Sequence, residues 1–549
     1  MNRTLQIHPR DNVLVALDDL ENGAEIHWNG RKVKTVERIP VKQKLAVEDI
    51  PKGGPLYMYG VLVGRATEDI PRGARLRTGN VVHATEAYSD KSDSYTWTPP
   101  DVSAWQSRSF RGFHRSDGRV GTANYWLIIP LVFCENRNVE VIREALLEEL
   151  GYPRPSSFAV NTRRLVELYQ QGAETADLLE ADIVQSAEEQ SGRRLFENID
   201  GIKTLDHEGG CGGTREDADS LIRLLAAYID HPNVGGATVL SLGCQHAQIA
   251  MLRKALRERH PDFDKPLVIL EQQQSPSERE FIAEAVKRSF VGLIEANRNQ
   301  RREASLSKLC IGLECGGSDG FSGISANPAL GHASDLLVAL GGCAILSEFP
   351  ELNGVEQELL NRCVDKATAD KFAHLMETYA RRAEAVGSGF AYNPSPGNIR
   401  DGLITDAIKS AGAARKGGTS PITSVLDYTE PAAGQGLQLL CTPGNDVEST
   451  TGLAGSGANI IVFTTGLGTP TGNPVAPTIK VSTNTRLARR MPDLIDIDAG
   501  TIISGQDSIE SKGREILDYI IRVASGEITP RAVQLGQDDF IPWKRGISL

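Results

Sequence analysis

The chain has 549 residues, long enough for about three or four domains. Its 40% hydrophobic and 24% charged residues are typical of a globular protein in water. The net charge of −12 and the lack of a long basic block argue against nucleic acid or an anionic membrane as the main partner. Small anionic substrates are compatible with this charge.

The first residues lack the apolar stretch of a signal peptide, and no apolar run approaches the roughly 20 residues that span a membrane. The eight cysteines do not have the spacing of a small disulfide-rich domain, so we expect them to be reduced thiols. The sequence therefore predicts a cytoplasmic protein with several domains.

Residues 1–92 have the pattern of a small all-β module. Short strand-like runs alternate with turns, and the sequence EDIPKG at 48–53 recurs as EDIPRG at 68–73. A repeated charged turn of this kind is typical of a compact β unit. Residues 93–108 follow within a stretch rich in Ser, Asp and Pro, which predicts a linker.

From residue 109 the pattern changes to strands that alternate with helices, with a helical insertion predicted at 153–200. Predicted strands lie at 125–134, 235–244, 266–271, 309–313, 344–348, 459–465 and 478–481, and predicted helices at 139–150, 248–259 and 333–340. This alternation predicts an α/β protein with mostly parallel, Rossmann-like sheets, divided into domains at 109–275 and 276–549. Ligands of such sheets gather beyond the carboxyl ends of the strands.

One stretch, GLECGGSDGFSGISANPALG at 312–331, has the pattern of a strand, a glycine-rich loop and a helix. Its glycines let the backbone come close to a ligand. Cys315, Ser318, Asp319 and Ser322 supply a thiol, a carboxylate and two hydroxyl groups within eight residues. A segment that only packs in a core does not need so many small and polar groups, so we expect an active-site loop.

Four cysteines each end an apolar or glycine-rich run at a predicted strand end: Cys134, Cys211, Cys244 and Cys315. If these strands are neighbours, the thiols could converge and bind iron or another soft metal. There is no CxxC pair, and free cysteine is among the most buried residue types, so a structural role is the alternative.

Two histidines are candidates for chemistry. His207 opens the glycine-rich turn HEGGCGG and could be a general base or a metal ligand; the alternative is a residue that caps the loop. His8 lies three residues before Asp11, which is followed by Asn12. The imidazole of His8 and the carboxylate of Asp11 could hold a divalent metal from a turn; the alternative is an ordinary polar turn.

Further polar groups follow other predicted strands. Glu348 and Glu351 could bind a metal or transfer protons, unless they are solvated acids at a helix start. The turns NPSPGN at 393–398, KGGTS from Lys416 and TTGLGTPTG around Thr465 are suited to hydroxyl and carboxylate recognition. The last of these lacks the glycine spacing and lysine of a nucleotide-binding loop. A sugar acid therefore fits these loops better than a nucleotide or a peptide.

Several of these motifs resemble the altronate/galactarate dehydratase family of sugar-acid hydro-lyases: GLECGGSDGFSGISANPALG, NPSPGN, TPGND, FTTGLGTPTG and IDIDAG. The similarity extends over essentially the whole chain. It includes IHPRDNVLVAL near the N-terminus, which resembles the family's SAF-type (β-clip) β domain. GLECGGSDG and SEFPELNGVEQ are more similar to altronate dehydratases than to galactarate dehydratases.

The resemblance implies an enzyme that uses Fe²⁺, or another divalent metal in its place, to dehydrate D-altronate to 2-dehydro-3-deoxy-D-gluconate in galacturonate breakdown. A base removes the proton at carbon 2, and an acid helps the hydroxyl at carbon 3 to leave as water. We assign the base to His207 and the acid to Glu348 or Asp319. The expected substrate-binding residues are Ser318, Ser322, Asn393, Asn398, Lys416 and Thr465, and the expected metal ligands are His8, Asp11, Cys211 and Cys315.

The sequence departs from the family at one place, where a usual Gly-His-Lys reads Lys42-Gln43-Lys44. The missing imidazole predicts a different metal, weaker metal binding or a shifted substrate. Two alternatives to altronate dehydration therefore stay open. They are dehydration of another sugar acid such as galactarate, and a sugar-acid-binding protein without catalysis. A homo-oligomer is compatible with either.

Overall fold

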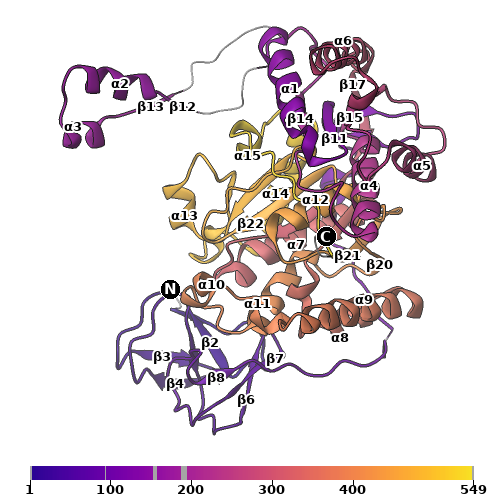
Figure 1. The fold of residues 1–549 in the computed structure, drawn as a ribbon. Coiled ribbons are helices and arrows are strands. Elements are labelled where there is room, and N and C mark those ends of the chain that lie inside the picture. The colour runs from indigo at the N-terminus through magenta and orange to yellow at the C-terminus, as the bar shows by residue number, and fades with distance from the viewer. Residues whose placement is uncertain (1–2, 93, 153–157, 187–193, 547–549) are drawn as a thin grey trace.

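The computed structural model describes residues 3–92, 94–152, 158–186 and 194–546 (Figure 1). In its described residues the N-terminal module contains strands and no helix, as predicted, and the strands form three small antiparallel sheets in the orders β1-β2-β5, β3-β4 and β6-β7-β8. A buried cluster that includes Leu14, Ile26 and Leu45 gives it a core of its own. The strands are β1 (Thr4–Leu5), β2 (Val13–Ala16), β3 (Glu25–Trp28), β4 (Arg31–Lys34), β5 (Lys44–Ala46), β6 (Pro55–Met58), β7 (Val61–Ala66) and β8 (Val81–Val82).

The predicted linker is an extended segment that lies against the C-terminal domain. Within its described residues, the regular structure is one short 3-10 turn, η1 (Ser103–Trp105). The Tyr95 hydroxyl donates to the Thr419 carbonyl at 2.6 Å, and the Trp97 indole donates to the Thr419 hydroxyl at 3.2 Å. Trp105 is buried and donates to Asp518 at 2.8 Å. The linker is therefore held at several points along its length.

The second domain is built on a four-stranded parallel sheet in the order β14-β11-β15-β16. An antiparallel sheet in the order β10-β9-β17 lies at its side. Helix α6 (Glu278–Ala296) packs on the parallel sheet through Phe281 and Leu293, so the domain extends past residue 275. The other elements are β9 (Ser109–His114), β10 (Val120–Gly121), β11 (Tyr125–Pro130), η2 (Phe133–Glu135), α1 (Asn136–Leu150), β14 (Gly201–Thr204), α4 (Arg215–Asp230), β15 (Val234–Ser241), α5 (Ile249–Arg259), β16 (Leu267–Glu271), η3 (Gln272–Gln274) and β17 (Arg301–Ser305).

The insertion predicted as helical at 153–200 contains a strand pair as well as helices, and residues 153–157 and 187–193 of it lie outside the described part. Its two strands pair antiparallel, with Phe158 opposite Ser186. The described elements are β12 (Phe158–Val160), α2 (Thr162–Gln170), α3 (Thr175–Glu180) and β13 (Val184–Ser186).

The C-terminal domain contains a seven-stranded parallel sheet in the order β20-β21-β19-β18-β22-β23-β24. Helices α7 (Ala326–Ala339) and α14 (Ile509–Ala524) pack together on one face, while α12 (Asp446–Gly455) packs on the other and contacts α4 of the second domain (Figure 1). The predicted α/β architecture with mostly parallel sheets is confirmed. The strands are β18 (Cys310–Cys315), β19 (Cys343–Leu346), β20 (Ile422–Leu426), β21 (Gly436–Leu440), β22 (Ile460–Thr465), β23 (Thr478–Ser482) and β24 (Ile497–Asp498).

The helices of this domain are mostly short and follow the strands. The longer ones are α7 (Ala326–Ala339), α9 (Lys366–Ala385), α12 (Asp446–Gly455) and α14 (Ile509–Ala524). The short ones are α8 (Glu356–Arg362), α10 (Pro396–Arg400), α11 (Asp406–Ala413), α13 (Thr485–Arg490) and α15 (Arg531–Gln534), with the 3-10 turns η4 (Leu306–Lys308), η5 (Ser322–Ile324), η6 (Phe349–Leu352), η7 (Phe390–Tyr392), η8 (Ala414–Gly417) and η9 (Gly500–Ile502). Among the described residues, no helix is both long and apolar enough to cross a membrane.

The sheet order identifies where a ligand would bind. From β18 the chain continues outward to β19 on one side, and later to β22 on the other side. Strand order therefore reverses at the β18–β22 pair, and a crevice at such a point is the usual ligand site of an open α/β sheet. The loop that follows β18 is the glycine-rich loop singled out in the sequence.

The second domain gives a test of its packing. Trp126 is fully buried, and a Cβ atom added at Gly292 would lie 2.1 Å from its ring. We expect Gly292→Ala to lower the free energy of unfolding by about 1–3 kcal/mol, because the ring or helix α6 has to move. Denaturant unfolding measures this change. Gly389→Ala is the control, since its Cβ would meet no atom within 4 Å. Equal stability of both variants would contradict the packing.

Candidate active site

The loop after β18 requires glycine at two positions. A Cβ at Gly316 would lie 2.0 Å from the Asp446 carboxylate. Gly317 has a φ of 58°, in the left-handed region that favours glycine. The loop therefore lies close to the start of α12, and it separates two groups of polar side chains.

The first group is a buried charge cluster formed by Cys315, Glu348, Glu351, Lys409 and Lys416. Each of the five is at most 9% exposed. Lys416 Nζ lies 2.8 Å from Cys315 Sγ and also contacts Glu348 Oε2. Lys409 Nζ lies 2.6 Å from Glu351 Oε1. Two ammonium groups thus face two carboxylates and a thiol at the ends of β18 and β19.

Glu348 is the member of the cluster best placed to exchange a proton. Burial, and then the charge of Glu351, raise the pKa of Glu348 to about 7, although Lys416 acts in the opposite direction. Its Oε1 atom is buried and has no hydrogen-bond partner among the described residues. Its backbone is in the left-handed region with a φ of 66°, which is uncommon for a residue with a side chain.

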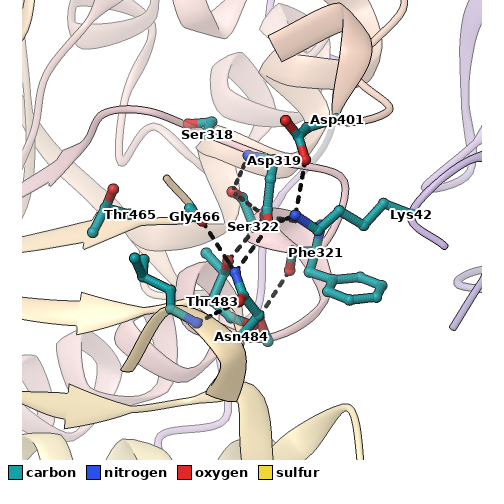
Figure 2. A network of polar contacts seen from close by, with 12 residues as sticks. Lys42, Ser318, Asp319, Phe321, Ser322, Asp401, Thr465, Gly466, Thr483 and Asn484 are labelled. Carbon is teal, nitrogen blue, oxygen red and sulfur yellow. Dashed lines mark hydrogen bonds and ion pairs between the residues drawn. The ribbon is translucent and has the colours of Figure 1, made fainter. Parts of the chain in front are cut away.

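The second group surrounds Asp319, whose carboxylate is fully buried (Figure 2). Lys42 Nζ lies 2.9 Å from Asp319 Oδ2 and 2.9 Å from Asp401 Oδ1. Thr483 and Asn484, which follow β23, donate to Asp319 at 2.9 and 3.2 Å. The Asp319 oxygens are therefore shared among several donors, and this arrangement fixes the loop.

Lys42 comes from the N-terminal module, so the module completes this group. Its backbone has a φ of 72°, again in the left-handed region. The neighbouring Gln43 is buried and donates to the Arg400 carbonyl at 2.8 Å. Lys44 Nζ donates to the Gly402 carbonyl at 2.6 Å, and burial lowers the pKa of Lys44 to about 7. The segment Lys42-Gln43-Lys44, which differs from the Gly-His-Lys usual in the family, therefore lies against the candidate site.

Most of the predicted substrate-binding residues lie around these two groups. Ser322 donates its hydroxyl to Asp319 at 3.2 Å, and Asn398 donates to the Ser318 carbonyl at 2.8 Å. Asn393 Oδ1 accepts from Lys409 at 2.6 Å. Together with Lys416 and with Thr465 at the end of β22, these residues meet at one edge of the sheet.

His207 lies in the second domain and contacts neither Asp319 nor Glu348 in the described part of the chain. Its Nε2 atom is 2.8 Å from the Pro130 carbonyl, and its Nδ1 atom accepts from the Gly209 N–H at 3.0 Å. Burial lowers the pKa of His207 to about 4. It borders a cavity of about 610 Å³ that is also lined by Cys211, His246 and Glu448.

The four predicted metal ligands do not meet. Asp11 accepts from the backbone N–H groups of His8, Tyr59 and Gly60 at 2.8–3.1 Å, so it organises the β module. His8 is exposed, and its Nδ1 atom accepts from the Arg10 N–H at 3.1 Å. Cys211 is exposed in the second domain, and Cys315 is buried in the third.

Donor atoms of Cys315, Glu348 and Glu351 lie within 4.8 Å of one another, as the ligands of one metal ion would. However, the ammonium groups of Lys416 and Lys409 already contact all three side chains. A divalent ion would have to displace both lysines, so the cluster does not fit a single iron ion. A second group, Asp117, Asp230 and His260, is likewise bound by arginines such as Arg119.

Three family models match the chain one after another. They are the altronate/galactarate dehydratase SAF domain at residues 2–84, the D-galactarate dehydratase/altronate hydrolase second domain at 112–297, and the D-galactarate/altronate dehydratase C-terminal domain at 306–548. The chain belongs to the altronate/galactarate dehydratase family. The resemblance drawn from the sequence motifs is therefore confirmed, and the β module is the family's SAF domain.

Relatives within the family align over nearly the full chain. The altronate dehydratase of Bacillus subtilis is 34% identical over 96% of this chain and 96% of its own. The altronate dehydratase of Escherichia coli is 33% identical with the same coverage. The galactarate dehydratase (L-threo-forming) of Escherichia coli is 30% identical over 95% of this chain and 93% of its own.

Asp11 provides a test that separates a structural carboxylate from a metal ligand. We expect Asp11→Ala to speed amide hydrogen exchange in β6 and β7 by about 30-fold or more, since buried N–H groups that lose a charged acceptor cost about 2 kcal/mol. Asp11→Asn, which keeps one acceptor oxygen, should have a smaller effect. Faster exchange in the unmodified protein after treatment with a chelator would instead assign Asp11 to a metal.

Proposed function

We propose that this chain is a hydro-lyase that dehydrates D-altronate to 2-dehydro-3-deoxy-D-gluconate, a step of hexuronate breakdown. The two altronate dehydratases are slightly more similar to it than the galactarate dehydratase is. The observation that carries the proposal is the buried charge cluster at the strand-order reversal. It combines a carboxyl group whose pKa is about 7 with two ammonium groups.

The two lysines of the cluster are suited to the anionic end of the substrate. Lys409 and Lys416 belong to α11 and η8, and both ammonium groups lie at the ends of β18 and β19. A sugar-acid carboxylate that pairs with them would have its carbon 2 near Glu348. The two positive charges also make the carbon 2 proton more acidic, because they stabilise the negative charge that develops when it leaves.

Glu348 alone could carry the proton transfer. Its carboxylate takes the proton from carbon 2 and then returns it to the departing hydroxyl on carbon 3, which leaves as water. The enol that remains becomes the 2-keto acid by proton exchange with solvent. Asp319, held by Lys42 and Thr483, would fix the loop that binds the sugar hydroxyls. These proton transfers need no metal ion within the charge cluster, where the two lysines already contact Cys315, Glu348 and Glu351.

A second candidate is dehydration of galactarate, which carries a carboxylate at both ends. Lys42 favours it, since this lysine brings a further ammonium group to the edge of the site, 2.9 Å from Asp319 and from Asp401. Galactarate would therefore use the Lys42 ammonium group for its second carboxylate, which D-altronate does not have.

The first experiment is turnover of a sugar-acid panel by anaerobically purified protein, with and without added Fe²⁺, with detection of the 2-keto-3-deoxy product. We expect turnover of D-altronate above that of the other acids. Preferred turnover of galactarate would overturn the substrate but keep the reaction. Sugar-acid binding without turnover under either condition would favour a non-catalytic binding protein.

The role of Glu348 predicts the pH dependence of this reaction. A base must be deprotonated, so kcat/KM should rise with pH through about 7, the pKa of Glu348. Glu348→Gln should reduce kcat by about 10²–10⁴-fold and remove this rise. Glu356→Gln is a matched control, because burial also raises the pKa of Glu356 to about 7 but its side chain lies outside the cluster. A control that loses the rise while Glu348→Gln keeps it would refute the assignment.

A further inference from the structure

Three of the cysteines singled out in the sequence lie at one edge of the second domain. Cys134, Cys211 and Cys244, here called the cysteine triplet, follow β11, β14 and β15 respectively. These strands are parallel neighbours in the order β14-β11-β15. Their carboxyl ends therefore meet at the same edge, and each end is followed by one cysteine within seven residues.

Hydrogen bonds join the three loops beside the cysteines. Phe133, next to Cys134, donates its backbone N–H to the Gly209 carbonyl at 3.1 Å. His246, two residues after Cys244, donates its backbone N–H to the Gly210 carbonyl at 2.9 Å. The 209–211 loop thus lies between the other two and holds all three cysteines in one region. A Cβ at Gly210 would lie 2.1 Å from the Leu131 carbonyl, so this close approach requires glycine.

The exposure of these thiols separates them from the rest. The triplet cysteines are exposed, whereas the other five are buried or half-buried: Cys310, Cys315, Cys343, Cys363 and Cys441. All eight lie in the described part of the chain, and within it the triplet thiols make no hydrogen bond. Exposed free thiols oxidise readily, so three at one place are explained better as ligands than as packing residues.

We propose that the cysteine triplet holds a [4Fe–4S] iron–sulfur cluster. Thiolates from cysteine are the usual ligands of such clusters. Sulfur atoms around one tetrahedral ion, at a metal–sulfur distance of about 2.3 Å, would lie about 3.8 Å apart. The three sulfurs do not all lie within 4.8 Å of one another. Thiolates that bind different irons of a cluster are spaced more widely than the ligands of one ion, so a cluster does not need the three sulfurs to lie that close.

The chemistry of assembly balances without a further oxidant. Two ferrous ions, two ferric ions and four sulfides make a core of charge +2, and each thiol releases one proton when its sulfur binds iron. Three thiolates leave one iron without a cysteine ligand. Cys211 and His246 line the cavity of about 610 Å³, so a small molecule there lies next to the cluster site.

The test is anaerobic reconstitution of the full chain with ferrous and ferric iron and sulfide, followed by removal of unbound iron. We expect about four irons and four acid-labile sulfides per chain, with the visible absorption of an iron–sulfur centre. Each single variant, Cys134→Ser, Cys211→Ser or Cys244→Ser, should lose most of both. Cys363→Ser is the control, since it removes a buried thiol outside the triplet whose hydrogen bond to the Leu359 carbonyl a hydroxyl can keep.

A second measurement guards against variants that fail to fold. In the reconstituted protein without substitution, the triplet thiols should resist alkylation and become reactive when a chelator removes the iron, as mapped by mass spectrometry. Protein that binds zinc, or a single iron without sulfide, would overturn the proposal. So would a triple variant, Cys134→Ser with Cys211→Ser and Cys244→Ser, that keeps its iron and sulfide. Equal alkylation of the triplet before and after iron removal would overturn it as well.

Discussion

The buried ammonium group of Lys416 is the contact on which the candidate site depends. Glu348 and Glu351 are brought together beside the Cys315 thiol at the ends of two adjacent parallel strands, where the two carboxylate charges would repel in the absence of a cation. Lys416 and Lys409 offset this repulsion. Because all five side chains are at most 9% exposed, water screens these interactions little, and removal of one partner would leave an unpaired buried charge.

Much of the fold could be predicted from the sequence because its signals are local. Apolar runs identified β11, β15, β18 and β22, and the all-β pattern identified the N-terminal module. Other elements gave weaker signals. β3 and β4 alternate with charged residues, and α6 belongs to the second domain only because Phe281 and Leu293 pack on its sheet. Such a boundary depends on tertiary contacts that a single sequence does not reveal.

The site was predicted in part for the same reason. Cys315 is the last residue of β18, and Asp319 and Glu348 lie in the loops after β18 and β19, so the strand pattern places all three at one edge of the sheet. Lys409 was missed because its position depends on where α11 packs. Lys42 appeared only as a departure from the family pattern, since nothing in its own segment indicates that it reaches Asp319. His207 was selected for its residue type, whereas backbone groups of the fold engage both of its ring nitrogens.

Because Lys42 belongs to the SAF domain, the candidate site is complete only while this domain stays bound to the rest of the chain. The domain supplies the ammonium partner of a fully buried carboxylate that belongs to a different domain. A chain cut within residues 85–104 could keep that partner, because Gln43 and Lys44 bind the Arg400 and Gly402 carbonyls independently of the connection. A chain that lacks the domain altogether would lose the Lys42 ammonium group, which is the cation that pairs with Asp319 among the described residues. The SAF domain is thus a component of the candidate active site that proteolytic nicking would spare and truncation would remove.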